Sequence, residues 1–229
     1  MYRDKFVGAV ILAAGRSERM GGRLNKVYRT LGGRPVLLHS IAKFLTSGIA
    51  DELVLVYNEK DKNVLKERVI PDIRNEVKVE IVPGGEKRQD SSLAGLRGLE
   101  TEYALIHDGA RPNFSPGLVE ELLETAADHG AAFPGVKPVD TIRKNRDGFA
   151  GETVDREKLV RVQTPQCFKR ELVLEALEEF SRKGKYYSDD AGAFMDYWDK
   201  NPRIVRGERE NLKLTTERDM KYAELLFDS

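Results

Sequence analysis

The feature that most constrains the fold of this chain is the alternation of short apolar, β-branched runs with longer amphipathic stretches. This alternation is typical of βαβ units, in which helices cover both faces of one sheet. The predicted strands are 7–12, 53–57, 77–82, 103–107 and 131–136. The predicted helices between them are 35–47, 60–69, 91–99 and 116–129. We therefore expect an α/β fold with a Rossmann-like, mostly parallel sheet flanked by helices.

The pattern changes at Lys137. From 139 to 163 the sequence alternates and carries a turn signal, Asn-Arg-Asp-Gly at 145–148, which predicts a β-hairpin. We expect an arm over about 137–163 that protrudes from the sheet. Helices are predicted again at 169–182 and 189–198. A short strand near 203–206, then the segment 211–214, precedes a closing helix that begins after two threonines at 215–216. Because no linker separates these parts, we expect a single domain over 1–229.

Composition and charge exclude several classes of protein. Lys plus Arg and Asp plus Glu number 38 each in 229 residues, so no long-range positive field attracts nucleic acid or an anionic membrane. Cys167 is the single cysteine, which excludes an internal disulfide and a cysteine-rich metal site. No apolar run approaches the ~20 residues that span a bilayer, and the first residues lack a signal-peptide layout. We expect a cytoplasmic protein without nucleic-acid or membrane partners.

A small-residue turn rich in cations follows the first predicted strand. The turn itself is Ala13-Ala14-Gly15, and four cations follow it at 16, 19, 23 and 26. Small residues let a nucleotide approach the backbone closely, and free N–H groups there can face phosphates. The alternative is a solvated basic loop without a ligand. Neither GxxxxGK[ST] nor GxGxxG occurs, which argues against an ATPase and a dehydrogenase.

With this loop, the sequence resembles the nucleotidyltransferase superfamily, whose members carry an L-A-A-G-x-x-x-R-M loop followed by a lysine. Further motifs follow in order: PGGEKRQDS at 83–91, HDGARP at 107–112, DT at 140–141, TVDR at 153–156, TPQ at 164–166 and NLK at 211–213. Together they resemble the 2-C-methyl-D-erythritol 4-phosphate cytidylyltransferases of the non-mevalonate isoprenoid pathway, over essentially the whole chain. The chain departs from the family at Asn25, where proline is usual, at an insertion over 21–24, and at Ser188, where threonine is usual.

The reaction that the resemblance implies is transfer of CMP from CTP to a polyol phosphate, with release of pyrophosphate. The nucleophile is a phosphate oxygen that attacks the α-phosphorus of CTP. A phosphate monoester has its second pKa near ~6, so it is largely dianionic at neutral pH and needs no general base. The protein must instead neutralise negative charge as two anions meet.

The resemblance also implies roles for individual residues. The predicted catalytic residues are Arg19, Lys26, Arg156 and Lys213. The predicted CTP-binding residues are Ala13, Ala14, Gly15, Gly84, Gly85, Glu86, Ser91, Asp108 and Ala110. Arg19 and Lys26 would bind the triphosphate, and the loop from Gly84 to Ser91 would read the cytosine. His107 closes a buried strand, so we expect it to be structural rather than a catalytic base.

The acceptor-binding residues implied by the resemblance are Asp108, Arg111, Thr141, Arg156, Thr164, Ser188 and Lys213. Thr141 and Arg156 lie on the predicted arm and would act across the interface of a homodimer. A two-stranded hairpin is marginally stable alone, which also favours pairing with another subunit. Mg²⁺ is expected to bridge CTP phosphate oxygens, and the sequence predicts no metal site made by the protein alone.

Three alternatives remain at this point. A ribitol 5-phosphate cytidylyltransferase would share the CTP motifs and differ in the acceptor-facing residues. A sugar-nucleotide pyrophosphorylase fits the Gly-Gly-Glu loop and the arm poorly. A non-catalytic nucleotide-binding protein would be favoured by loss of Arg19 or Lys26, and both are present.

Overall fold

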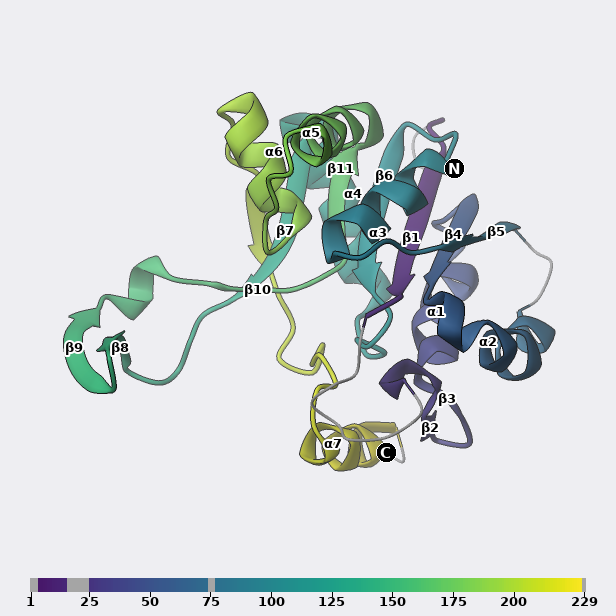
Figure 1. The fold of residues 1–229 in the computed structure, drawn as a ribbon, viewed down its shortest axis with the longest axis horizontal. Coiled ribbons are helices and arrows are strands. Elements are labelled where there is room, and N and C mark those ends of the chain that lie inside the picture. The colour runs from purple at the N-terminus through teal and green to yellow at the C-terminus, as the bar shows by residue number, and fades with distance from the viewer. Residues whose placement is uncertain (1–3, 16–24, 74–76, 228–229) are drawn as a thin grey trace.

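The computed structural model describes residues 4–15, 25–73 and 77–227. Its centre is an eight-stranded sheet in the order β10-β7-β11-β6-β1-β4-β5, with β12 also paired to β7 (Figure 1). The predicted strands are confirmed as β1 (Val7–Ala13), β4 (Glu52–Tyr57), β5 (Lys78–Pro83), β6 (Tyr103–Asp108) and β7 (Ala131–Val136). β1 pairs in parallel with β4 and with β6, and β4 pairs in parallel with β5. The predicted α/β fold with a mostly parallel sheet is therefore confirmed.

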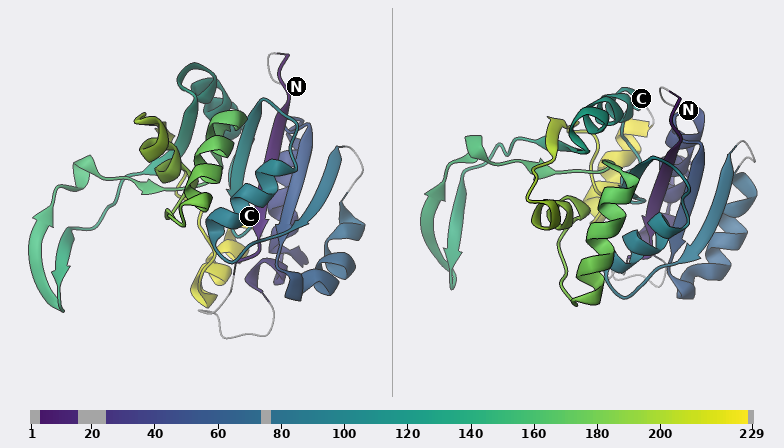
Figure 2. Two further views of the ribbon diagram at one scale, coloured as in Figure 1. Left: turned by 45° about the horizontal axis from the view of Figure 1, so that its top comes forward. Right: turned by 90° about the horizontal axis from the view of Figure 1, so that it is seen from above.

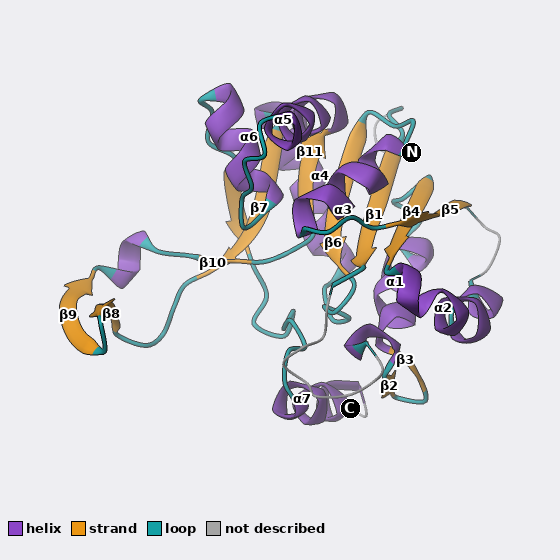
Figure 3. Ribbon diagram, viewed as in Figure 1, coloured by secondary structure: helices purple, strands orange, loops and turns teal. Residues whose placement is uncertain are grey.

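Helices cover both faces of the sheet (Figure 3). One face packs α1 (Val36–Thr46), α2 (Lys62–Arg68) and α4 (Pro116–His129), and the other packs α3 (Arg88–Arg97), α5 (Arg170–Arg182) and α6 (Asp190–Trp198). Side chains of β1 alternate between the two cores: Ala9 and Ile11 face the first, whereas Val10 and Leu12 face the second. This alternation follows from the pleat of the strand, and burial on both sides explains its continuous apolar run.

The predicted arm is present, but the hairpin is shorter than expected. It consists of β8 (Ile142–Arg146) and β9 (Phe149–Val154), which pair with each other in a separate two-stranded sheet. Asp147 and Gly148 close it with positive φ angles of 51° and 91°, the backbone that a tight two-residue hairpin turn requires. The hairpin stands away from the main sheet in every view (Figures 1 and 2).

The end of the segment predicted as hairpin belongs to the main sheet instead. β10 (Arg161–Val162) and β11 (Gln166–Lys169) both run antiparallel to β7, and β11 also pairs with β6. The helix predicted at 169–182 is confirmed as α5 (Arg170–Arg182), whereas the strand β11 that precedes it was not predicted. The run Gln-Cys-Phe-Lys is too short to show a period of its own, and its pairing with β6 and β7 is a long-range contact.

The C-terminal part returns to the beginning of the fold. β12 (Arg203–Arg206) pairs with β7 as predicted, and α7 (Glu217–Phe227) closes the described chain. Met220 and Ala223 of α7 pack on Leu31 and Val36, next to a small hairpin formed by β2 (Thr30–Leu31) and β3 (Arg34–Pro35). This hairpin is not among the predicted strands. The segment before α7, residues 211–214, lies near the carboxyl end of β6, where the N–H of Leu214 donates to the carbonyl of Ala110 at 2.9 Å. Within the described residues, no helix is both long and apolar enough to cross a membrane.

Candidate active site

Two adjoining hollows lie at the carboxyl edge of the parallel strands, where open α/β sheets bind ligands. The larger one, here called the main cleft, has a volume of about 430 Å³. It is lined by Leu12, Ala13, Ala14, Gly15, Asn25, Lys26, Val27, Asn58, Gly85, Glu86, Lys87, Arg88, Ser91, Asp108, Ala110 and Lys213. The smaller one, here called the side pocket, has a volume of about 280 Å³. It is lined by Arg88, Asp108, Arg111, Val162, Gln163, Thr164, Gln166, Ser188, Asp189 and Lys213.

Small residues allow the walls of the main cleft to approach each other. Gly84 follows β5, and a Cβ atom placed there would lie 2.4 Å from the Cβ atom of Ala14. A Cβ atom on Gly85 would lie 2.3 Å from the Cβ atom of Asp90. Such contacts are far inside van der Waals distance, so glycine is required at both positions. The two glycines bring the start of α3 next to the turn that follows β1.

Asn25 joins the two ends of the cation-rich loop. Its side-chain nitrogen donates to the carbonyl oxygens of Ala13 and Gly15, at 3.2 and 2.9 Å. The same nitrogen lies 3.0 Å from the carboxylate of Asp61. Asn25 also caps the short helical turn that begins at Lys26, which lines the main cleft. At this position, where proline is usual in the family, the asparagine amide provides a side-chain tether.

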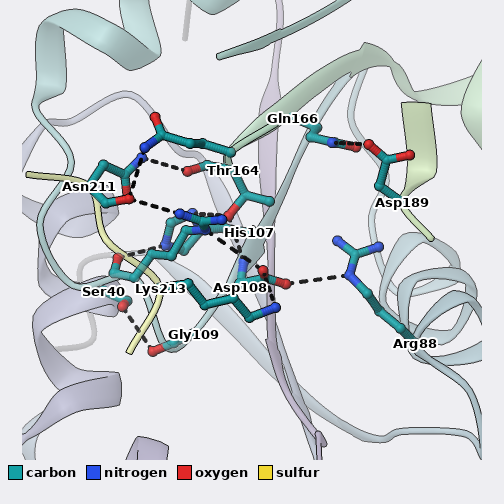
Figure 4. Close-up of polar contacts among 12 residues, drawn as sticks. Ser40, Arg88, His107, Asp108, Gly109, Thr164, Gln166, Asp189, Asn211 and Lys213 are labelled. Atoms are coloured by element: carbon teal, nitrogen blue, oxygen red, sulfur yellow. Dashed lines mark hydrogen bonds and ion pairs between the residues drawn. The ribbon is translucent and has the colours of Figure 1, made fainter. Parts of the chain in front are cut away.

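Asp108 is the centre of an ionic cluster at the junction of the two hollows (Figure 4). One oxygen of its carboxylate lies 2.7 Å from Lys213 Nζ, and the other lies 3.4 Å from Arg88 Nε. Arg111 Nε is 3.8 Å from the first oxygen. Burial alone would raise the pKa of Asp108, but the facing charges of Arg88 and Lys213 lower it far below its usual range. Asp108 is therefore ionised at neutral pH.

His107 is buried beneath this cluster and lines neither hollow. Its Nε2 atom lies 3.0 Å from the carbonyl oxygen of Arg111, which can only accept, so Nε2 carries the proton. Its Nδ1 atom then accepts the hydroxyl of Thr164 at 3.2 Å, and that hydroxyl accepts the backbone N–H of Asp108 at 3.0 Å. Burial lowers the pKa of His107 to about 3, so the ring is neutral. These contacts support the expected structural role.

Two buried glutamine amides hold the segment that carries Ser188. Gln166 of β11 donates to the Asp189 carboxylate at 2.9 Å and accepts the backbone N–H of Ala191 at 3.1 Å. Gln89 of α3 donates to the carbonyl of Lys185 at 3.1 Å and accepts the N–H of Tyr187 at 3.1 Å. Each amide uses both its donor and its acceptor, which fixes the wall of the side pocket on two sides.

Most of the sequence-predicted residues come together here. The main cleft contains Ala13, Ala14, Gly15, Lys26, Gly85, Glu86, Ser91, Asp108, Ala110 and Lys213. The side pocket contains Arg111, Thr164 and Ser188, together with Asp108 and Lys213. Gly84 lies behind the lining of the main cleft, where it contacts Ala14. Arg19 lies outside the described residues. Thr141 and Arg156 lie on the arm, away from both hollows of the same chain.

Four polar residues at the site received no individual role from the sequence: Asn25, Arg88, Asp190 and Asn211. Arg88 Nη1 lies 2.7 Å from the buried carboxylate of Asp190. The side-chain nitrogen of Asn211 donates to the carbonyl of Thr164 at 2.9 Å, and the backbone carbonyl of Asn211 accepts from Arg111 Nη1 at 2.8 Å. Arg88 and Asn211 lie within the motifs and Asp190 lies close to Ser188, so their positions in the sequence indicated that they belong to the site. Their roles could not be predicted, because the residues they contact are distant in the sequence.

Comparison with known proteins agrees with this geometry. The model of the family described as 2-C-methyl-D-erythritol 4-phosphate cytidylyltransferase matches residues 7–229. The chain belongs to this family. A 2-C-methyl-D-erythritol 4-phosphate cytidylyltransferase from Clostridium acetobutylicum is 39% identical over 221 residues, which cover 95% of this chain and 96% of that protein. One from Geobacillus kaustophilus is 37% identical over 222 residues, covering 96% of each chain.

Solved structures of 2-C-methyl-D-erythritol 4-phosphate cytidylyltransferases share the fold. The enzyme of that name from Thermus thermophilus superposes with a TM-score of 0.81 at 31% identity, covering 98% of this chain and 100% of the other. The 4-diphosphocytidyl-2C-methyl-D-erythritol synthase from Anaerococcus prevotii gives a TM-score of 0.84 at 26% identity, covering 98% and 99%. The similarity therefore extends over nearly the whole length of each chain.

Proposed function

We propose that this chain transfers CMP from CTP to 2-C-methyl-D-erythritol 4-phosphate, giving 4-diphosphocytidyl-2-C-methyl-D-erythritol and pyrophosphate. The observation that carries the proposal is the junction of two hollows at Asp108, Arg88 and Lys213. A transferase of this kind needs one site for the nucleotide and one for the acceptor, which must meet where the new bond forms. The family relationship agrees with this function and does not favour the ribitol 5-phosphate alternative.

CTP is assigned to the main cleft. The small residues of 13–15 allow close approach of the triphosphate, and Lys26 lies in the same lining. Gly85, Glu86 and Ser91 line the opposite wall, where backbone and side-chain groups can discriminate the cytosine ring. The volume of about 430 Å³ is within the usual range for a small-molecule site. Arg19 is also proposed to bind the triphosphate, because it is the arginine of the L-A-A-G-x-x-x-R-M motif.

The acceptor is assigned to the side pocket. Thr164 and Ser188 would hydrogen-bond the polyol, and Arg111 faces the same hollow. Lys213 lies at the junction, so its ammonium can stabilise the acceptor phosphate as it approaches the α-phosphorus. The attacking oxygen is already anionic, so the residues at the junction orient the reactants and neutralise charge rather than remove a proton. The leaving group is pyrophosphate, which departs from the side of the main cleft.

Mg²⁺ is proposed to accompany CTP. Within the described residues, no group of three or more His, Cys, Asp or Glu side chains has the arrangement of a metal site. The carboxylate of Asp108 faces the junction, but cations surround it. This donor set fits an ion held mainly by CTP phosphate oxygens, with Asp108 nearby. When bound, the ion would neutralise phosphate charge and orient the triphosphate.

A homodimer is proposed in which the arm of one subunit completes the site of the other. The arm exposes large apolar side chains, with Phe149 79% and Val139 60% exposed, and a second subunit would cover such surface. Arg156 is then available as an acceptor-binding cation in the partner's site. Mixing Arg156→Ala with Lys26→Ala subunits should restore part of the activity through hybrid dimers. No recovery after verified subunit exchange would contradict a shared site.

The proposed function is tested by pyrophosphate release from CTP and Mg²⁺, with 2-C-methyl-D-erythritol 4-phosphate and ribitol 5-phosphate offered in parallel. We expect release with the former and little with the latter. The product should be confirmed by mass spectrometry, because hydrolysis of CTP to CMP also releases pyrophosphate. Preference for ribitol 5-phosphate would overturn the acceptor assignment. No release with either acceptor would overturn the assignment of the chain as an active cytidylyltransferase.

A further inference from the structure

We propose that Arg88 is a further catalytic residue, whose guanidinium binds phosphate oxygens at the point where CTP and the acceptor meet, and that Asp190 is its positioning residue. The proposal rests on the proposed function, because it assigns the two hollows to the two substrates. It adds a cation that the motifs did not assign and that lines both hollows.

The first argument is the position of Arg88, which is the first residue of α3 and lies between Gly85 and Ser91, within the loop assigned to cytosine recognition. Three residues line both hollows, and Arg88 is one of them beside Asp108 and Lys213. Because the bond between the acceptor phosphate and the α-phosphorus must form where the hollows meet, a side chain at this junction lies next to the reacting groups. Its side chain is 27% exposed, which leaves part of the guanidinium open to a ligand.

The second argument is the orientation of the guanidinium. Nη1 donates to Asp190 at 2.7 Å and Nε to Asp108 at 3.4 Å, so two carboxylates fix the plane of the group at two of its three nitrogens. The remaining terminal nitrogen, Nη2, makes no hydrogen bond within the described residues. An arginine fixed in this way presents the N–H groups of Nη2 in a constant direction, where they can donate to a phosphate oxygen.

The third argument concerns Asp190 itself. Its carboxylate is 1% exposed and lines neither hollow, so it is not placed to contact either substrate. Its Oδ1 atom has no hydrogen-bond partner within the described residues, and its Oδ2 atom is occupied by Arg88. A buried carboxylate is costly unless it is paired, and breaking such a pair is more costly still. Holding Arg88 is the role that these contacts support.

The charge at the junction completes the argument. Arg88, Arg111 and Lys213 converge on Asp108, and Asp190 is paired with Arg88. Three cations face two carboxylates, so the cluster retains one net positive charge before any ligand arrives. A triphosphate and a second phosphate bring several negative charges to the same place. The cluster is therefore built to receive anions, and Arg88 is its link between the two hollows.

The test compares Arg88→Gln and Arg88→Lys with Arg97→Gln as a matched control. Arg97 lies on the same helix, is 60% exposed and pairs with Glu178 on the surface. Steady-state kinetics should show kcat lowered roughly 10²–10³-fold for Arg88→Gln, as for loss of one transition-state donor. Arg88→Lys should recover part of this loss, and Arg97→Gln should match the unmodified chain. A kcat for Arg88→Gln within about threefold of the control would overturn the proposal.

A binding measurement separates phosphate contact from a structural role. CTP and cytidine are titrated by NMR into each variant without acceptor. Arg88→Gln should weaken binding of CTP and leave that of cytidine unchanged, because cytidine carries no phosphate. Equal weakening of both would show that the substitution disturbs the cleft and would overturn the phosphate contact. This binding measurement does not depend on turnover. A chain inactive with the proposed acceptor would therefore refute the proposed function, while the contact of Arg88 with phosphate would still be tested.

The positioning role of Asp190 is tested by Asp190→Asn, which keeps the size of the side chain. It should lower kcat by less than Arg88→Gln, and adding it to Arg88→Gln should have little further effect, since both act through one group. Multiplicative effects in the double variant would show that Asp190 acts independently of Arg88. Thermal unfolding is recorded alongside, and activity is compared only below the transition of each variant.

Discussion

The ammonium nitrogen of Lys213 lies 2.7 Å from a carboxylate oxygen of Asp108, although the two residues are far apart in the sequence. Asp108 ends β6 in the centre of the sheet, whereas Lys213 belongs to the irregular segment before α7. The contact places a cation at the junction of the main cleft and the side pocket. Together with the hydrogen bonds of Asn211 to Thr164 and Arg111, it holds the C-terminal part of the chain at the site.

Replacing Lys213 by methionine keeps the length of the side chain and removes its charge. We expect kcat/KM with the polyol phosphate to fall roughly 10²–10³-fold, because a cation at the junction stabilises developing phosphate charge. The measurement is coupled pyrophosphate release. Lys183→Met serves as the control, since Lys183 is 61% exposed and pairs with Glu179 on the surface. Similar activities of the two variants would show that Lys213 does not contribute to the reaction.

The neutral state of His107 predicts a specific dependence of stability on pH. Its pKa is about 3 in the folded protein and near ~6.5 in the unfolded chain. Below about pH 6.5 the unfolded state binds a proton that the folded state does not, so the free energy of unfolding falls as the pH falls. This one group should cost about 2 kcal/mol between pH 7.5 and pH 5.

Urea unfolding at several pH values checks this expectation. His107→Gln should be less stable at pH 7.5, since two buried hydrogen bonds change, but its stability should fall less steeply toward pH 5. The ring proton signals of His107 should also stay constant in NMR spectra over the same range. A titration of this ring near pH 6.5 would show that the imidazole is not held neutral.

Asn25 is expected to control the geometry of the loop that carries Lys26. Asn25→Ala removes three contacts of the side-chain nitrogen, and Asn25→Asp also places a carboxylate against the oxygens of Ala13, Gly15 and Asp61. We expect kcat/KM for CTP to fall about tenfold in the alanine variant, as for loss of roughly 1.4 kcal/mol, and further in the aspartate variant. Asn63→Ala, exposed on α2, is the control. An aspartate variant as active as the control would show that the tether is unimportant.

Gln166 is expected to affect the acceptor more than the nucleotide. Gln166→Glu keeps the acceptor for Ala191 N–H but brings a carboxylate against that of Asp189, which lies 2.9 Å from the present donor. Repulsion should displace the wall that carries Ser188 and raise KM for the polyol phosphate several-fold, with KM for CTP nearly unchanged. Gln166→Met, which adds no charge, should be milder. Equal rises in both KM values would indicate a general disturbance of the fold.

Much of the fold could be predicted because its signals are local. β1, β4, β6 and β7 are buried on both sides, so their apolar runs mark them without knowledge of their partners. The prediction failed for β11, which is only four residues long and is held by its neighbours β6 and β7. β10, at the end of the segment that was predicted as hairpin, pairs with β7 for the same reason.

For the site, the sequence by itself determined which segments carry the chemistry. Glycines and small residues indicate where a nucleotide can approach the backbone closely, and the motifs contain the cations of the site. Both can be predicted from the sequence because each depends on the residue type at a single position. The tertiary structure alone decided how the charges pair: Arg88 with both Asp108 and Asp190, and Lys213 with Asp108. It also decided the tautomer of His107 and the tether of Asn25. Burial of an apolar run follows from local periodicity, whereas the partner of a charge depends on which distant segments the folded sheet brings together.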